Sequence, residues 1–315
     1  MKRLSALLIS LLLLTGCAGP SGESPDNTSP GTAAIETPSP TLTSTPASSP
    51  IATPAVARPD VSTPVLAGGL LVGGLDHGQW TSYKAFYQSQ TVDFDGFVYN
   101  VYVDDELTGQ AKGAMPESFL TGEPIDPEGD LSALSDVNLY DENGHEVEYD
   151  IAISADWDLF PRKYTEQSTD SEEYQALMED LLVQEGLTDP VTALRQVVAV
   201  DLDGDGTEEV LISSDSTPDD QFDKPEKGDN ALLVLRKTID GQPVDRIVAS
   251  NIMKRDPITD FPYRDSYTVE SCADLDGDGI LEVVVKRKQY EGTIYSIYKL
   301  EGDRMIRVAS NGAGV

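Results

Sequence analysis

The chain has 315 residues and carries 55 acidic against 22 basic side chains, which gives a formal net charge of −33. Nucleic acids and anionic membrane surfaces attract clusters of Lys and Arg, so this charge argues against nucleic acid as a partner and against docking of the protein body on an anionic membrane. The 2 histidines and 2 cysteines are too few for a His-based zinc site or a disulfide framework. A strongly acidic surface attracts cations instead.

The N-terminus has the pattern of a bacterial export signal. Lys2 and Arg3 precede an apolar run over residues 4–14, which is too short to span a membrane but fits the hydrophobic part of a signal peptide. The sequence LTGC that follows, ending at Cys17, resembles the lipobox of bacterial lipoproteins. This resemblance implies a signal peptide over residues 1–16 and lipidation of the Cys17 thiol. The protein is then extracytoplasmic, anchored by lipid to the cell membrane or the outer membrane; an ordinary signal peptide with an incidental cysteine is the alternative.

The lipidated cysteine is expected to begin a disordered stalk over residues 17–65. This stretch is rich in Ser, Thr, Pro and Ala, and it contains no aromatic side chain. Such a composition buries too little apolar surface to offset the entropy of ordering the chain. Repeated prolines favour extended backbone, so we expect the stalk to hold the folded body away from the lipid surface.

An N-terminal β-rich segment is predicted over residues 66–168. Four runs of apolar, β-branched or aromatic residues are typical of strands. The dipeptide Asn143-Gly144 lies between two alternating runs, which predicts a tight hairpin turn. The four runs cover residues 70–74, 97–103, 137–140 and 147–153.

Four aromatic side chains near the start of this segment allow two interpretations. They could pack into the hydrophobic core, which is the interpretation we prefer, or they could form a platform on which sugars stack. They are Trp80, Tyr83, Phe86 and Tyr87.

One connecting helix is predicted over residues 169–187. Apolar side chains recur there at helical spacing and form a single stripe. Thr169 and Glu172 fit a capping box, with Asp170 as an alternative N-cap, and Gly186 stands where a glycine commonly ends a helix. The stripe consists of Tyr174, Leu177, Met178, Leu181 and Leu182.

Residues 188–315 contain an internal repeat. The sequences DLDGDGTEEV and DLDGDGILEV begin at Asp201 and at Asp274, an offset of 73 residues. Strand-like runs precede and follow both copies, so each unit is expected to form four short antiparallel strands, the size of a propeller blade. We therefore predict a mainly β fold with one clear α-helix, in which two tandem propeller-blade-like units follow an N-terminal β-rich segment. Two blades do not close a propeller. Three arrangements are therefore possible: a partial propeller, a sandwich, or a propeller completed by the N-terminal strands.

Each repeat carries an acidic loop suited to a hard cation. Aspartates alternate with glycines that tolerate positive φ, so the chain can coil round one point. Oxygen ligands on a flexible loop suit Ca²⁺ rather than zinc, although a pair of acidic turns that bind cations weakly is the alternative. The predicted ligands are Asp201, Asp203, Asp205, the Thr207 carbonyl and Glu209 in the first loop, and Asp274, Asp276, Asp278, the Ile280 carbonyl and Glu282 in the second.

The flanking sequence separates these loops from two related calcium motifs. An EF-hand needs a glutamate at its twelfth position and helices on both sides, but Ile212 and Val285 occupy that position here and the flanks are strand-like. A dockerin module also needs a helix after the loop. The spacing instead resembles the calcium loop of FG-GAP/VCBS-type repeats of integrin-α-like propellers, over about residues 194–308. The resemblance implies structural ions that join two strands; the Phe-Gly and Gly-Ala-Pro elements that name the family are not evident.

No catalytic motif stands out in the sequence, and Cys272 is expected to be a buried thiol rather than a nucleophile. We therefore predict a non-enzymatic binding, adhesion or ligand-capture module whose partner is a protein or a glycan. The alternative is an extracellular hydrolase of polysaccharides or phosphate esters that uses the repeats as a scaffold. That alternative predicts a concave pocket that contains a pair of carboxylates with shifted pKa values, separate from the two loops.

Overall fold

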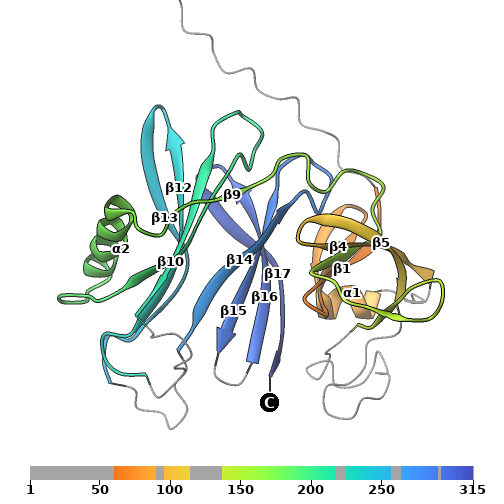
Figure 1. The fold of residues 1–315 in the computed structure, drawn as a ribbon, viewed down its shortest axis with the longest axis horizontal. Helices are drawn as coiled ribbons and strands as arrows, with labels where there is room; N and C mark the ends of the chain where they lie inside the picture. Colours follow the sequence, from red (N-terminus) through yellow and green to blue (C-terminus); the bar gives the residue numbers. More distant parts are fainter. Residues whose placement is uncertain are drawn as a thin grey trace, which may run out of the picture. The chain divides into compact units, whose positions relative to one another are not determined.

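The computed structural model describes residues 60–89, 96–113, 137–216, 225–256, 264–289 and 292–314 (Figure 1). In these ranges the protein is mainly β, with two helices and three antiparallel sheets. The predicted signal peptide, Cys17 and the stalk up to residue 59 lie outside the described residues. None of the described helices is both long and apolar enough to cross a membrane.

The N-terminal sheet has eight strands in the order β3-β2-β1-β8-β4-β5-β6-β7, and helix α1 follows β3. The predicted hairpin is confirmed, because β6 pairs with β7 across a turn in which Gly144 has a φ of 78°. The elements are β1 (Thr63–Ala67), β2 (Leu70–Asp76), β3 (Gln79–Ser82), α1 (Tyr83–Ser89), β4 (Val98–Val103), β5 (Glu106–Gly113), β6 (Leu139–Tyr140), β7 (Glu146–Val147) and β8 (Ile151–Ile153).

The predicted stalk extends too far, because its last residues form strand β1. Thr63 and Val65 are buried, and β1 pairs with β2 on one side and with β8 on the other. Composition did not reveal this, since the burial of β1 comes entirely from strands that follow later in the chain. Pro64 lies before the pairing with β8 begins at Val65, near the start of the strand, where a missing N–H is tolerated.

Both repeats form antiparallel meanders of four strands, as predicted. The first meander gains a fifth strand, β9, from the segment that precedes α2, so its order is β13-β12-β11-β10-β9, and the second has the order β14-β15-β16-β17. The elements are β9 (Thr165–Glu166), α2 (Glu172–Gln184), β10 (Ala193–Val200), β11 (Glu209–Asp215), β12 (Asn230–Ile239), β13 (Gln242–Ile252), β14 (Ser266–Ala273), β15 (Glu282–Gln289), β16 (Gly292–Glu301) and β17 (Arg304–Gly314).

Helix α2 begins at a different cap from the one predicted. Ser171, with extended dihedral angles of −81° and 111°, is the N-cap, and its Oγ accepts a hydrogen bond from the Tyr174 N–H at 3.3 Å. Thr169 and Asp170 therefore precede the cap. The end of the helix follows the prediction, because Gly186 has a φ of 98° directly after the C-cap residue.

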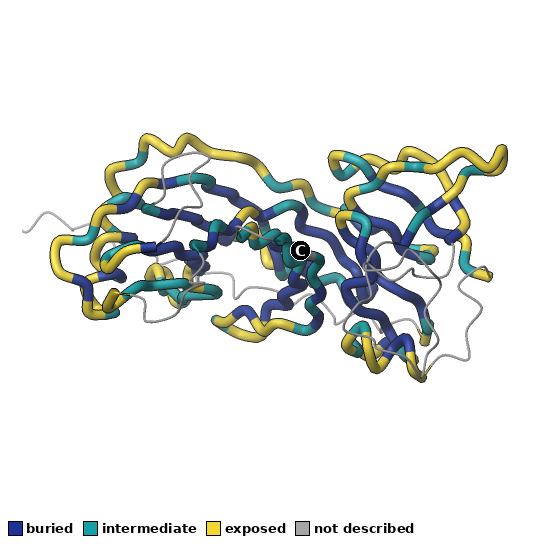
Figure 2. The backbone as a smooth tube through the Cα atoms, turned by 90° about the horizontal axis from the view of Figure 1, so that it is seen from below, coloured by how far each residue is buried: buried dark blue, intermediate teal, exposed yellow. Residues whose placement is uncertain are grey.

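The sheets stack face to face, and four hydrophobic clusters lie between successive layers of sheets and helices. Helix α2 packs Met178 and Leu182 on one face of the first repeat, and the opposite face of that repeat packs on the second repeat. The second repeat packs its other face, including Val284 and Ile297, on the N-terminal sheet. Figure 2 shows buried backbone along the strands and exposed backbone in the connecting turns. The described sheets thus form consecutive layers.

The aromatic residues near α1 belong mainly to the core. Phe86 and Tyr87 are fully buried in the cluster between α1 and the N-terminal sheet, and Tyr83 packs against that cluster. Cys272 is a buried free thiol, as predicted, and burial raises its pKa strongly. Gly74 in β2 faces the ring of Phe86 so closely that a Cβ atom would lie 2.1 Å from Cδ2 of that ring.

Gly74→Ala is therefore expected to lower the free energy of unfolding by about 1–3 kcal/mol, because the added methyl group must displace a buried ring. Urea denaturation measures the change. Gly109→Ala is the matched control, since Gly109 also lies in a strand but a Cβ there meets no atom within 4 Å. The control should stay within about 0.5 kcal/mol of the parent; equal effects of the two substitutions would contradict the packing of α1 on β2.

Candidate metal centre

Each acidic loop connects the first two strands of its meander. The first loop runs from the end of β10 to Glu209 at the start of β11, and the second runs from the end of β14 to Glu282 at the start of β15. The glycines at equivalent positions have positive φ in both loops, with 73° at Gly204 and 72° at Gly277. The two copies therefore coil in the same way.

The two loops also share their hydrogen bonds. The glutamate at the ninth position accepts a hydrogen bond from the N–H of the leucine at the second position, at 2.9 Å from Leu202 to Glu209 and at 2.8 Å from Leu275 to Glu282. The first aspartate accepts one from the glycine at the sixth position, as in the 3.0 Å contact from the Gly279 N–H to Asp274 Oδ2. These contacts orient the carboxylates inward before any ion binds.

The structure brings together three of the predicted ligands in each loop. One carboxylate oxygen from each of Asp201, Asp203 and Glu209 lies within 4.8 Å of the others, and the same holds for Asp274, Asp276 and Glu282. All three residues of the second triad are buried, whereas in the first triad only Glu209 is fully buried.

The remaining predicted ligands stand outside these triads. Asp205 Oδ1 accepts a hydrogen bond from the Thr207 N–H at 2.7 Å, and Asp278 Oδ1 accepts one from the Ile280 N–H at 3.0 Å. These bonds hold the loop in its coil. The carbonyls of Thr207 and Ile280 remain predicted ligands.

Two lysines that the sequence analysis missed point into the loops. Lys299 in β16 donates hydrogen bonds to Asp276 at 2.6 Å, to Asp278 at 2.7 Å and to Glu282 at 2.9 Å. Lys237 occupies the equivalent place in β12. The available signal was a lysine at the eighth position of the third strand in both repeats.

In the first loop the lysine contacts two carboxylates instead of three. Lys237 donates to Asp203 Oδ2 at 2.7 Å and also to Glu209 Oε1. Both lysines are buried, with 8% of Lys237 and 5% of Lys299 exposed. Each loop therefore contains one internal cation that comes from the third strand of its own meander.

One ammonium group does not balance the charge of a loop that carries five carboxylates in the first repeat or four in the second. Burial raises the pKa of Asp274 to about 6, and burial together with the charge of Asp276 raises the pKa of Glu282 even beside Lys299. In both loops, moreover, Oδ1 of the first aspartate, Asp201 or Asp274, is buried and has no hydrogen-bond partner among the described residues. Hard oxygen donors, excess negative charge and an unsatisfied oxygen together fit a bound cation.

Arg162 joins the two loops. Its Nε donates to the Asp201 carbonyl at 2.6 Å, and its Nη2 donates to the Leu202 carbonyl at 3.1 Å and to the Gly279 carbonyl at 2.7 Å. The Leu281 N–H also donates directly to the Leu202 carbonyl at 2.8 Å. The first loop is thus fixed to the second where the two repeats meet.

The second loop is fixed in turn to the N-terminal part of the chain. Trp157 Nε1 donates to the Asp274 carbonyl at 2.8 Å, and the Asp274 N–H donates to the Leu159 carbonyl at 2.8 Å. Trp80 in β3 donates from Nε1 to Asp276 Oδ2 at 3.1 Å. Each acidic loop therefore lies at the boundary between two neighbouring sheets.

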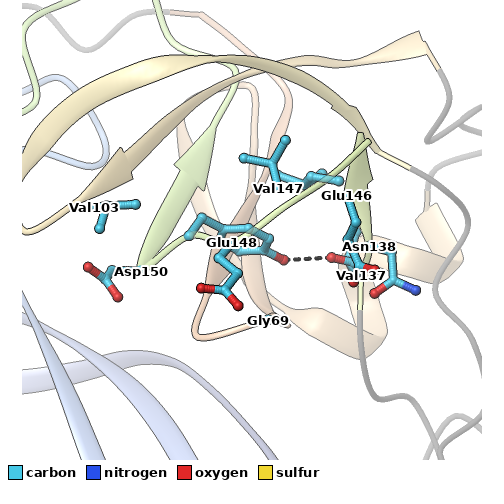
Figure 3. A pocket seen from close by; sticks show the side chains of 10 residues that line it. Gly69, Val103, Val137, Asn138, Glu146, Val147, Glu148 and Asp150 are labelled. Carbon is cyan, nitrogen blue, oxygen red and sulfur yellow. Dashed lines mark hydrogen bonds between the residues drawn. The ribbon is translucent and has the colours of Figure 1, made fainter. Parts of the chain in front are cut away.

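A separate pocket of about 440 Å³ lies in the N-terminal sheet (Figure 3). Glu146, Glu148 and Asp150 line it, and the Tyr149 hydroxyl donates to the Val137 carbonyl at 2.7 Å. Asp150 already accepts a hydrogen bond from the Asp104 N–H at 2.8 Å, which fixes the turn after β4. A group of carboxylates away from the two loops is one feature that the hydrolase alternative predicts, and the described lining residues include no serine, cysteine or histidine.

Comparisons with protein-family models, with curated proteins and with solved structures find no match to the chain. The two loops by themselves indicate a metal centre. They share a sequence, a backbone conformation, a carboxylate triad and a buried lysine, which a chance cluster of exposed acidic residues does not do.

The raised pKa of Asp274 predicts that the protein without metal loses stability as the pH rises. A carboxyl group with a folded-state pKa of about 6, against an ordinary value of 3.8, contributes a stability that is fully present below about pH 4 and lost by about pH 6. The loss corresponds to about 2–3 kcal/mol. Urea denaturation in EDTA between pH 4 and 7 measures it.

Asp274→Asn should reduce this pH dependence, because the amide does not ionise, and leave the part that comes from Glu282. Asp170→Asn, in an exposed position outside the loops, is the control and should leave the dependence unchanged. An unaltered pH profile in Asp274→Asn would contradict the burial of this carboxylate.

Proposed function

We propose that the protein is a lipid-anchored, extracytoplasmic binding module whose two acidic loops each hold a structural Ca²⁺ ion. The observation that carries the proposal is the pair of equivalent carboxylate triads, at Asp201, Asp203 and Glu209 and at Asp274, Asp276 and Glu282. Their oxygen donors suit Ca²⁺ better than softer metals. Outside the cytoplasm, millimolar Ca²⁺ allows sites of modest affinity to be filled.

A structural role for the ions is supported by burial and by position. The side chains of Asp276 and Glu282 are 0% exposed, so a substrate has no access to them. Each loop contacts the neighbouring sheet, so neutralising its charge stabilises the stacking of the layers and contributes to folding free energy. The same role is implied by the resemblance to FG-GAP/VCBS-type repeats.

The anchor and the binding role follow from the rest of the chain. The lipobox that ends at Cys17 and the Ser/Thr/Pro-rich stalk support display of a folded body at the cell surface. The net charge of −33 argues against nucleic acid as the partner. We propose a protein or glycan ligand and no catalytic activity.

Calcium dependence of thermal stability tests the ion sites. The melting temperature of the full chain should fall in EDTA and recover on addition of Ca²⁺, because the ion binds only the folded loops. Mg²⁺ at the same concentration should restore less, since it needs a tighter octahedral geometry. Melting curves that are identical in EDTA and in Ca²⁺ would remove the ions from the proposal.

The variant Lys299→Met tests whether the lysine and the ion share the same carboxylates. The lysine shares Asp276, Asp278 and Glu282 with the proposed ion, so its removal should lower stability in EDTA and increase the stabilisation by Ca²⁺. Lys254→Met is the matched control, because Lys254 is 54% exposed, lies outside the loops and pairs with Glu185 at 3.0 Å. Should both variants respond to Ca²⁺ like the parent, the lysine and the ion do not share a site.

Cys17→Ser tests the anchor. In a bacterial host, the parent protein should remain with the membrane fraction and incorporate labelled palmitate, whereas the variant should do neither, because the thiol is the acceptor of the lipid. Cys272→Ser, which changes the buried cysteine, is the control and should behave like the parent. Membrane attachment of Cys17→Ser would contradict lipidation at this residue.

A further inference from the structure

A pocket of about 490 Å³ lies between the two repeats, away from the acidic loops. The facing sides of the two sheets form one hydrophobic cluster around β10, β11 and β14. Towards the outer strands the sheets no longer fill the space between them, and β13 faces β16 and β17 across the pocket. This pocket is independent of the cation site and of the acidic pocket in the N-terminal sheet.

The lining of this pocket has the opposite charge to the protein as a whole. Arg287 and Arg307 line it, and none of its described lining residues is acidic, in a chain with a net charge of −33. Hydroxyl groups complete the polar lining. They belong to Ser250, Tyr267, Ser296, Tyr298 and Ser310.

The polar groups are held in place by the sheets that carry them. Ser296 and Ser310 form a hydrogen bond between their Oγ atoms at 3.0 Å across β16 and β17. Arg307 is the direct cross-strand partner of Tyr298 in the same pair of strands. A pocket built on paired strands positions its donors more rigidly than one built on loops.

Arg287 retains donor capacity that the protein does not use. Its Nε is buried and has no hydrogen-bond partner among the described residues. Its Nη1 lies 3.8 Å from Asp265 Oδ2, which is an ion pair without a short hydrogen bond. Asp265 is already occupied, because it accepts hydrogen bonds from Gln289 at 2.8 Å and from the Tyr267 hydroxyl at 3.3 Å. The Arg287 side chain as a whole is 33% exposed, so a ligand in the pocket can reach its guanidinium group, whose planar geometry matches an oxyanion.

We propose that the pocket between the repeats binds a small oxyanion-bearing ligand, with Arg287 and Arg307 as the cationic contacts and the Tyr298 hydroxyl and one hydroxyl of the Ser296–Ser310 pair as further donors. The shared chemistry is a carboxylate, sulfate or phosphate group on a polar body. This deepens the proposed role as a binding module by naming the class of ligand, and it rests on that role. It does not depend on the identity of the ions in the acidic loops.

Isothermal titration calorimetry of the full chain with matched probes tests the proposal. Galacturonate and galactose differ in one carboxylate, so galacturonate should bind and galactose should bind at least about tenfold more weakly. Titrations with sodium sulfate and with inorganic phosphate show whether the pocket prefers a sulfate, a phosphate or a carboxylate group. Binding of galactose as strong as that of galacturonate, or no heat from any of the anions, would overturn the proposal.

Arg287→Gln and Arg307→Gln should each weaken binding of the preferred anion at least about tenfold. Arg304→Gln is the matched control, because it changes the net charge equally at the start of β17 but its side chain is 69% exposed and outside the pocket. Equal loss in the control would show attraction by net charge alone and would overturn the site. If Arg287→Gln fails to fold, as circular dichroism would show, Arg307→Gln, whose side chain is exposed, decides the question.

The titrations are performed both in Ca²⁺ and in EDTA below the melting temperature. Anion binding without any effect of Ca²⁺ on stability would refute the structural ions while supporting the pocket. Stabilisation by Ca²⁺ without anion binding would do the reverse. The two proposals therefore fail separately.

Discussion

The stacking of the sheets depends on neutralising the carboxylates of the two acidic loops, because each loop lies where two sheets meet. Five acidic side chains lie in the loop of the first repeat and four in that of the second, and a β-strand on each side of the loop brings them close together. A lysine from the third strand of the same meander supplies one positive charge, through Lys237 in the first repeat and Lys299 in the second. The remaining negative charge, together with the buried Oδ1 atoms of Asp201 and Asp274, explains why a cation is the natural complement of both loops.

The same loops determine how the sheets stack. Leu202 follows the first aspartate into the core between the repeats, and Leu275 follows its equivalent into the core between the second repeat and the N-terminal sheet. Arg162 and Trp157 donate to the backbone of the loops from a segment that precedes both repeats. Charge balance inside a loop and packing between sheets are therefore coupled, because a loop that expanded through repulsion would also break these contacts.

Stacking of successive sheets has a second consequence, which is the pocket between the repeats. Two twisted sheets in contact near their inner strands diverge towards their outer strands. Here the diverging faces carry Arg287 and Arg307 rather than further apolar residues. The molecule thus separates its charges: carboxylates gather at one set of turns, where cations are expected, and guanidinium groups line the one space between the repeats that we propose for anions.

Much of the architecture follows from local sequence. The hairpin at Asn143-Gly144, the apolar stripe of α2 and the strands of both repeats depend on neighbouring residues, and the structure contains them. Three features were not predicted from local sequence. Strand β1 and helix α1 lack a strong local pattern, and the choice of Ser171 over Thr169 as N-cap depends on backbone geometry at the start of the helix.

For the site, the sequence by itself determined the acidic loops, because six consecutive residues carry the alternation of aspartate and glycine that coils the chain. Only the tertiary structure decided what faces those carboxylates. Lys299 is 17 residues from Glu282, and Arg162 is 39 residues from Asp201. Trp80 is 196 residues from Asp276. Such contacts depend on strand register and sheet stacking, which arise from packing over the whole body rather than from spacing along the chain.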